Sequence, residues 1–218
     1  MSQTGTPLRN IYRRLLAAYG PQHWWPADTP FEVMVGAILT QNTNWKNVEM
    51  AIANLKAADM LKAEKIADCD EVHLGELIRS SGFFNQKAVR LKAFCRFYLD
   101  QGRESGLKRL DDPRQTLLAL NGIGPETTDS MLLYALDVPV FVVDAYTKRI
   151  FSRLGMISAK ASYTEVQQLF QDQLDADVSM FNEYHALIVN HAKHHCRVKP
   201  VCTVCPLLDL CPAGQSNT

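Results

Sequence analysis

Apolar residues recur every three or four positions along most of this chain, which is the spacing of helices buried on one face. Nine helical segments are predicted, at 7–20, 31–40, 47–61, 88–102, 113–120, 125–136, 145–154, 163–174 and 181–195. The nearest approach to a strand is the short run "VPVFVVD", residues 138–144. The pattern therefore predicts an all-α protein of about ten helices joined by short loops.

The composition is that of a globular protein with a sizeable core. The chain has 218 residues, of which 47% are hydrophobic, enough for one domain or two small lobes. Its opening residues, "MSQTGTPLRN", lack the apolar segment of a secretion signal, and no apolar run approaches the length of about 18 residues that spans a membrane. We therefore expect a cytoplasmic protein without membrane contact.

The charges are unevenly distributed although the formal net charge is zero. Residues 85–110 contain seven basic and two acidic side chains, while residues 161–183 contain five acidic side chains and no Lys or Arg. A basic face of this kind would attract a phosphate backbone. Solvated helix surfaces would give the same composition, so charge alone leaves both interpretations open.

Four cysteines crowd into sixteen residues near the C-terminus, as Cys-x5-Cys-x2-Cys-x5-Cys. Disulfides are rare in the cytoplasm, and structural zinc usually takes two short Cys pairs, of which only the central one is present here. Four thiolates in one loop fit a [4Fe–4S] cluster better than zinc. The predicted ligands are Cys196, Cys202, Cys205 and Cys211.

The stretch "LNGIGPET", residues 120–127, predicts a tight turn between two helices. Gly122 and Gly124 permit positive φ and leave room for a ligand near the backbone, and Pro125 suits the first position of a helix. Backbone amides at such a helix start can bind phosphate, although most Gly-x-Gly sequences are ordinary turns. Eighteen residues after Glu126, Asp144 ends an apolar run and can cap the next helix.

These motifs, with "GAILTQNTNW", "SGFFNQKA", "VVDAYTKR" and "HALIVNHAKHHC", occur in an order that resembles the helix-hairpin-helix DNA glycosylases of the endonuclease III superfamily. The resemblance implies two helical lobes that bind double-stranded DNA containing a damaged base across the cleft between them. One lobe, residues 28–136, would be a six-helix barrel ending in the hairpin; the other would join residues 1–27 to 137–218 and carry an iron–sulfur cluster loop at 196–211. The family usually has six residues between the first two cysteines, whereas this chain has five. We expect a monomer.

The resemblance also implies roles for single residues. Asp144 would lie at the cleft, where a carboxylate stabilises the positive sugar and orients water. Family members that also cut the backbone carry a lysine amine where this chain has Glu126, so we expect base removal only. Lys148 is the nearest rival amine and is interpreted as a phosphate or surface lysine.

Extruding a base leaves a gap in the duplex that the protein must fill. By the resemblance Gln41, with Asn42 beside it, would fill the vacated stack, and Phe83 would intercalate on the opposite strand. A helix-end glutamine and a core phenylalanine are the alternatives. Further DNA contacts are expected from Lys87 and Lys148 and from the hairpin residues Gly122, Ile123 and Gly124.

The three tryptophans indicate the substrate. Trp24 and Trp25 precede Pro26, and Trp45 follows the "LTQNT" stretch; the 3-methyladenine DNA glycosylase III subgroup, some members of which lack the cluster cysteines, lines its base pocket with these motifs. Indole faces favour a cation by about 0.5–2 kcal/mol. We expect a monofunctional glycosylase for cationic purines such as 3-methyladenine, with Glu126 at the pocket and the base sandwiched between Trp45 and Trp24 or Trp25.

Two alternatives remain from the sequence. One is a glycosylase for oxidised or mismatched pyrimidines, of the endonuclease III type. The other is a non-catalytic protein that binds damaged DNA or transfers electrons through its iron–sulfur cluster.

Overall fold

The computed structural model describes residues 6–216, and every regular element in that range is helical. The prediction of an all-α protein is therefore confirmed. The first five residues, half of the segment examined above for a secretion signal, lie outside the described range. None of the helices in the described part is long and apolar enough to span a membrane.

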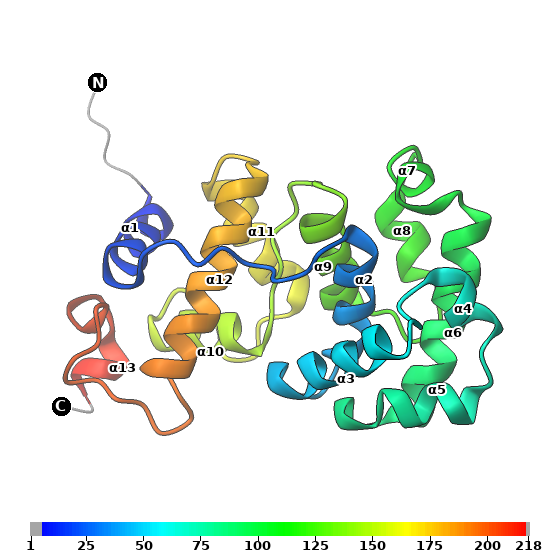
Figure 1. The fold of residues 1–218 in the computed structure, drawn as a ribbon. Coiled ribbons are helices and arrows are strands. Elements are labelled where there is room, and N and C mark those ends of the chain that lie inside the picture. Colours follow the sequence, from blue (N-terminus) through cyan, green and yellow to red (C-terminus); the bar gives the residue numbers. More distant parts are fainter. Residues whose placement is uncertain (1–5, 217–218) are drawn as a thin grey trace. The chain divides into compact units, whose positions relative to one another are not determined.

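The chain folds into two compact units (Figure 1). The first unit joins Met1–Trp24 to Pro139–Thr218, and the second is Trp25–Val138. The sequence placed the boundaries at residues 28 and 136, a few residues away. The first unit contains α1 (Pro7–Tyr19), α10 (Ala145–Arg153), α11 (Tyr163–Gln173), α12 (Val178–His194), a short 3-10 turn η2 (Leu208–Leu210) and α13 (Pro212–Gln215).

The second unit is built around two mostly buried helices, α2 (Pro30–Leu39) and α9 (Pro125–Ala135). It contains α2 (Pro30–Leu39), α3 (Trp45–Ala57), α4 (Ala63–Asp68), α5 (Glu71–Leu77), η1 (Arg79–Ser81), α6 (Phe84–Asp100), α7 (Arg103–Leu107), α8 (Pro113–Leu118) and α9 (Pro125–Ala135). Every residue of α2 from 32 to 39 is buried, and α2 packs against α6 and α9. Residues 33–39 are apolar on all sides of the helix, and the buried Glu32 is paired with Lys56. These three helices carry the loops described below.

The core of the first unit is aromatic. The rings of Phe141 and Phe170 stack with centroids 3.8 Å apart, and Phe181 meets Phe141 edge to face at 5.4 Å. The hydroxyl of the buried Tyr184 donates to the carbonyl of Leu8 at 2.9 Å, which joins α12 to α1. Ring stacking and burial therefore connect helices that lie far apart in sequence.

The apolar run at 140–143, the closest match to a strand in the sequence, is buried but forms no strand. The run lies between α9 and α10 along the chain, and no strand is present among residues 6–216. Side chains of α11 instead hydrogen-bond the backbone of Phe141 and Val143.

Candidate functional site

Side chains of α11 hold the extended segment that leads to Asp144. The amide of Phe141 donates to Gln171 Oε1 at 3.1 Å, and Gln167 Nε2 donates to the Phe141 carbonyl at 2.7 Å. The amide of Val143 donates to the Tyr163 hydroxyl at 3.3 Å. Buried backbone groups must find partners, and these bonds replace those of a sheet. They fix the approach to the start of α10.

Asp144 caps α10 and is nearly buried. Its Oδ1 accepts from the Thr147 amide at 2.7 Å and from the Thr147 hydroxyl at 2.8 Å. Its Oδ2 lies 3.7 Å from His185 Nε2 on α12, and the two side chains are only 12% and 8% exposed. Asp144 therefore caps α10, as its sequence position suggested, but the cap uses only Oδ1. Sequence analysis did not single out His185, which only the packing of α12 against α10 brings to Asp144.

The surroundings of Asp144 keep the carboxylate ionised. Burial raises the pKa of Asp144, but the neighbouring His185 imidazole and the two donors of Thr147 outweigh that effect, so its pKa is lowered from the usual value. A buried carboxylate that remains charged at neutral pH is well suited to stabilise a positive charge forming beside it.

The turn between α8 and α9 uses its two glycines differently. Gly122 has φ of 82°, and a Cβ there would lie 2.3 Å from Arg90 Nε, so both the backbone and the packing require glycine. Gly124 is extended, with φ of −94°, and a Cβ there would meet nothing within 4 Å. Of the two glycines that permit positive φ, only Gly122 adopts it, whereas Gly124 leaves open space for a ligand near the backbone.

The rest of this hairpin consists of a buried residue, Ile123, and the exposed start of α9. Ile123 is only 5% exposed, so its side chain belongs to the core, and the predicted contact of Ile123 with DNA could involve only its backbone. Helix α9 begins at Pro125 and has no side-chain cap. A helix start without a cap retains amides for an anion.

The Gln41 side chain is bound to the hairpin. Its Nε2 donates to the Gly122 carbonyl and to the Thr127 hydroxyl, both at 3.0 Å, and its Oε1 accepts from Arg90 at 2.7 Å. The adjacent Asn42 is exposed, with φ of 53°, in the left-handed region that non-glycine residues seldom adopt. The loop after α2 is therefore tied to the hairpin and ends in an exposed, strained residue.

Phe83 is exposed. It precedes α6 with φ of 46° and ψ of 32°, and 61% of its surface is accessible. The alternative of a core phenylalanine is therefore wrong. A large apolar side chain held outward in a strained conformation suits insertion into another molecule.

Lys87 cannot contact phosphate in this structure, which contradicts its assignment as a DNA-binding residue. It is 1% exposed, and its ammonium donates to the carbonyls of Leu39 at 2.8 Å and Ser81 at 2.7 Å. Burial and the nearby Arg90 lower the pKa of Lys87 to about 8. Burying an ammonium is costly unless it is hydrogen-bonded, and these two carbonyls accept from two of its three N–H groups.

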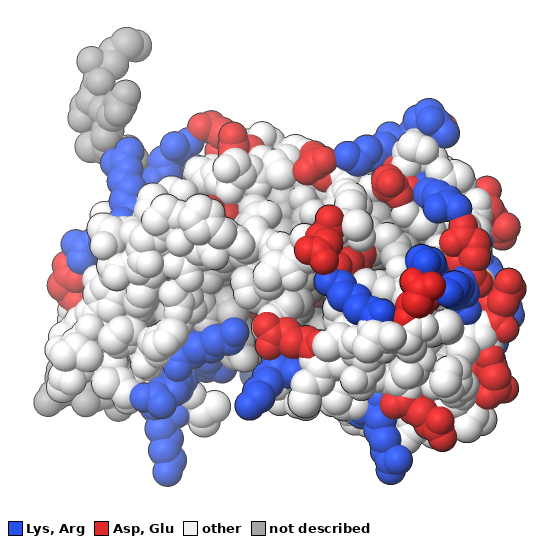
Figure 2. Space-filling model, viewed as in Figure 1, with Lys and Arg blue, Asp and Glu red and all other residues white. Residues whose placement is uncertain are grey.

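The wider basic segment, 85–110, is also engaged within the second unit. Arg103 pairs with Glu64 and Lys108 with Asp137, while Lys92 and Arg96 donate to the carbonyls of Cys69 and Ala67. Figure 2 shows acidic and basic side chains interspersed over one face of this unit, around α4 and α7. Of the two interpretations that the composition left open, these contacts favour solvated surfaces of mixed charge over a basic face.

A pocket of about 180 Å³ in the second unit contains two of the three tryptophans. Its lining residues are Trp25, Pro26, Glu32, Gly36, Trp45, Glu49, Ile52, Ala53 and Lys56. A Cβ on Gly36 would lie 3.3 Å from the Trp25 ring, so the glycine lets the indole lie against α2. The rings of Trp25 and Trp45 are perpendicular, at 89°, with centroids 5.0 Å apart. No planar base fits between rings in direct edge-to-face contact, so the predicted sandwich of Trp25 and Trp45 is wrong in this arrangement.

Trp24 and Glu126 were also predicted to line the base pocket, but neither lines the pocket of Trp25 and Trp45. Trp24 belongs to the first unit, where the ammonium of Lys193 lies 5.9 Å from its ring centroid. Glu126 is exposed in the first turn of α9, where an acid is favoured by the helix dipole. Lys148, the rival amine, is half-buried and donates to the Ala161 carbonyl at 2.9 Å.

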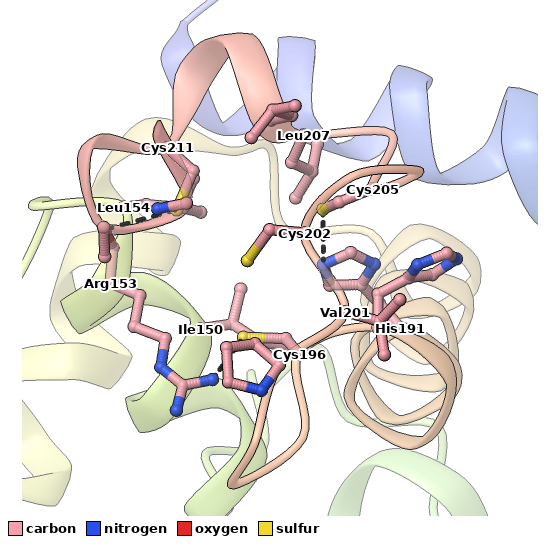
Figure 3. A pocket seen from close by; sticks show the side chains of 15 residues that line it. Ile150, Arg153, Leu154, His191, Cys196, Val201, Cys202, Cys205, Leu207 and Cys211 are labelled. Atoms are coloured by element: carbon pink, nitrogen blue, oxygen red, sulfur yellow. Dashed lines mark hydrogen bonds between the residues drawn. The ribbon is translucent and has the colours of Figure 1, made fainter. Parts of the chain in front are cut away.

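The four clustered cysteines surround one pocket in the first unit (Figure 3). In the described range none of the four forms a disulfide, and α10 and α12 supply apolar and basic side chains around them. Arg153 donates to Cys196 Sγ at 3.2 Å, and the Gly214 amide donates to Cys211 Sγ at 3.3 Å. Among the described residues, no three His, Cys, Asp or Glu side chains converge closely enough to hold a single metal ion.

The loop after Cys196 is anchored by the same arginine. Arg153 also donates to the carbonyls of Arg197 at 2.7 Å and Val198 at 3.1 Å. Residues Arg197, Val198 and Lys199 are all exposed, with Val198 81% accessible. The cysteine loop thus presents two basic side chains to solvent.

Comparison with known proteins gives the family. Residues 35–175 match the model of the HhH-GPD superfamily of base excision DNA repair proteins. A protein of Methanocaldococcus jannaschii that carries the name "Putative DNA repair glycosylase" is 53% identical over 206 residues, covering 92% of this chain and 94% of its own. Endonuclease III of Sulfolobus acidocaldarius is 28% identical over 191 residues, 86% of this chain and 83% of its own.

Solved structures of a 3-methyladenine DNA glycosylase and of endonuclease III resemble this chain. The crystal structure of 3-methyladenine DNA glycosylase (MagIII) of H. pylori bound to 1,N6-ethenoadenine superposes with a TM-score of 0.72 and 31% identity, over 85% of this chain and 97% of that one. A non-covalent complex of endonuclease III with DNA shares the fold, with a TM-score of 0.84 at 23% identity over 96% of each chain. The chain therefore belongs to the HhH-GPD superfamily of base excision repair proteins and is a DNA glycosylase of that family.

Proposed function

We propose that this protein is a monofunctional glycosylase that removes cationic alkylated purines, such as 3-methyladenine, from duplex DNA, and that it acts as a monomer in the cytoplasm. The observation that carries the proposal is the charge and shape of the Trp25–Trp45 pocket. The similarity to the 3-methyladenine glycosylase of H. pylori supports the same substrate class.

The pocket combines indole rings with a net negative lining. Two carboxylates, Glu32 and Glu49, face one ammonium, Lys56, which gives a net charge of −1. Glu32 and Lys56 pair at 2.8 Å, so Glu49 is the carboxylate in excess, and it accepts from Trp45 Nε1 at 2.9 Å. A base alkylated at a ring nitrogen carries a delocalised positive charge, which indole faces and a nearby carboxylate both favour. A base stacked on one indole, rather than between two, fits the perpendicular rings.

Asp144 supplies the catalytic charge in this proposal. Breaking the glycosidic bond builds positive charge on the sugar, and a carboxylate held in a nearly dry environment stabilises it strongly. Thr147 fixes Oδ1 by two hydrogen bonds, which leaves Oδ2 to face the sugar or the attacking water. An alkylated purine is already a good leaving group, so a carboxylate without a partner acid is sufficient.

The absence of strand cleavage follows from the side chains available. Glu126 occupies the hairpin position at which a lysine amine would attack the sugar, and a carboxylate cannot form an imine. Lys148 lies one turn after Asp144, but its amine is hydrogen-bonded to the Ala161 carbonyl. The product in this proposal is an intact abasic site.

We further propose a [4Fe–4S] cluster on Cys196, Cys202, Cys205 and Cys211. The four thiols are arranged around a pocket, as suits a cluster in which each sulfur binds a different iron, whereas zinc needs its ligands to converge on one ion. The donors from Arg153 and Gly214 stabilise thiolate charge. The cluster would be structural, holding Arg197 and Lys199 towards phosphate.

Base release from defined duplexes tests the proposal. The protein is incubated with duplexes that each carry one lesion, and released bases are identified by mass. Methylated purines should be released without strand cleavage. Release of thymine glycol or uracil alone would support the second candidate, an oxidised- or mismatched-pyrimidine glycosylase, which the similarity to endonuclease III favours. No release from any duplex would leave only a damage-binding protein.

A pair of variants addresses the pocket itself. Glu49→Gln removes the excess charge but keeps an acceptor for Trp45 Nε1, so release of a cationic purine should fall while folding is preserved. Glu71→Gln, an exposed change at the start of α5, is the matched control and should leave release unchanged. Equal release by both variants would contradict the role of pocket charge.

A further inference from the structure

Side chains of helix α6 contact three loops of the second unit. These are the Gln41 loop (residues 40–44), the Phe83 loop (residues 79–83) and the hairpin (residues 119–125). Two side chains one turn apart on α6, Lys87 and Arg90, make these contacts, and neither projects into solvent as a free cation.

Lys87 connects the Gln41 loop and the Phe83 loop close to the points where they leave the core. Leu39, whose carbonyl accepts from Lys87 Nζ at 2.8 Å, is the last residue of α2, directly before the Gln41 loop. Ser81, whose carbonyl accepts at 2.7 Å, is the last residue of η1, two residues before Phe83. A single ammonium therefore bridges the points from which the two loops leave the core.

Arg90 joins the first of these loops to the hairpin. It donates to Gln41 Oε1 at 2.7 Å, and its side chain lies against Gly122, where even a Cβ would approach Arg90 Cδ to 2.7 Å. Gln41 in turn donates to the Gly122 carbonyl. The three loops thus form one hydrogen-bonded assembly on α6.

The tips of the Gln41 loop and the Phe83 loop are strained and exposed, while the backbone beside the core is held by Lys87. Asn42 and Phe83 both have positive φ, at 53° and 46°, and Phe83 is 61% exposed. Left-handed conformations of non-glycine residues are unfavourable and persist only when the surroundings impose them. A buried ammonium is itself costly, and an apolar residue could fill the same space, so packing alone does not explain lysine at position 87.

We propose that Lys87 is a positioning residue that fixes the Gln41 loop and the Phe83 loop relative to each other, so that both enter damaged DNA as one unit. The proposal rests on the proposed function, in which these loops fill the gap left by an extruded base. A rigid pair loses little freedom on binding, and it binds well only where the duplex is already open. Lys87 then contributes to discrimination between damaged and intact DNA without touching either.

The test compares Lys87→Met with Lys92→Met. Both lysines lie on α6 and donate to backbone carbonyls, but Lys92 binds the Cys69 carbonyl at the end of α4, away from these loops. The measurement is the ratio of affinities for a duplex with a tetrahydrofuran abasic analogue and for the intact duplex. Lys87→Met should lower this ratio about tenfold, or about 1.4 kcal/mol, and Lys92→Met less than about twofold. A folded Lys87→Met protein with the wild-type ratio would overturn the proposal.

A mutant cycle keeps the proposal testable if Lys87→Met does not fold. Gln41→Ala, Phe83→Ala and the double variant are compared for abasic-duplex affinity in the otherwise wild-type chain. Coupled loops predict a double loss smaller than the product of the single losses, by about fivefold or more. Independent, multiplicative losses would overturn it. Failure of the proposed function is distinguishable, because it appears as wild-type protein that releases no methylated purine, a result separate from the affinity ratios that test Lys87.

Discussion

Gly122→Ala should destabilise the protein strongly, while the same change at Gly124 should not. At Gly122 the alanine must adopt φ of 82°, which costs about 1–2 kcal/mol for an L-residue. Its Cβ would also lie 2.3 Å from Arg90 Nε and 2.7 Å from Cδ, so Arg90 must move, at about 1–2 kcal/mol for an overpacked site. The sum, about 2–4 kcal/mol, lowers the melting temperature by roughly 4–16 °C for a chain of this size.

Gly124→Ala is the matched control. Its backbone is extended and the space around its Cβ position is open, so no clash or backbone strain arises. The smaller entropy of the unfolded chain stabilises the variant and alanine at the N-cap of α9 destabilises it, so stability should change by less than about 1 kcal/mol. The new methyl group would nevertheless obstruct a phosphate at the start of α9, so affinity for duplex DNA should fall. Thermal unfolding followed by circular dichroism gives the stabilities, and fluorescence anisotropy gives the affinity.

The clash itself can be separated from the backbone strain. Arg90→Ala removes the atoms that the new Cβ would meet, so adding Gly122→Ala to that variant should cost about 1 kcal/mol less than in the wild-type chain. Equal stability of Gly122→Ala and Gly124→Ala, or an Arg90→Ala background that changes nothing, would refute this account of the hairpin.

Four further outcomes are expected. Asp144→Asn keeps an acceptor for Thr147 and should fold and bind DNA, but single-turnover base release should fall by about a hundredfold or more, as for loss of one preorganised charge; near-normal rates would remove Asp144 from the mechanism. His185→Asn leaves burial opposed mainly by Thr147, so the pKa of Asp144 rises and the acidic fall-off of the pH–rate profile, which follows protonation of the carboxylate, moves to higher pH; an unmoved profile would exclude His185 as its electrostatic partner. Phe83→Ala should weaken abasic-duplex binding by about tenfold or more with an unchanged melting temperature, since the ring is 61% exposed; parallel losses of both would restore the core interpretation. Anaerobically purified protein should contain four irons per chain with a matching visible absorbance, and stoichiometric zinc instead would show that the cysteine pocket was misread.

The sequence by itself determined the helical class and the order of the motifs. Apolar spacing placed the helices because each buries one face, and Pro125 and Asp144 begin helices because a fixed φ and a side-chain cap satisfy what a helix start requires. The four cysteines were identifiable because their spacing keeps them in one loop, and the structure places them around one pocket.

What only the tertiary structure decided is which long-range partner each polar side chain meets. Lys87 looks like a surface lysine in sequence, yet it is buried beneath two loops that lie 48 and 6 residues away along the chain. His185 meets Asp144 only because α12 packs against α10, 41 residues apart in sequence. Periodicity and spacing report the local conformation of a segment, whereas burial, charge pairing and ring geometry depend on contacts between distant segments, and these decide which side chains remain available to DNA.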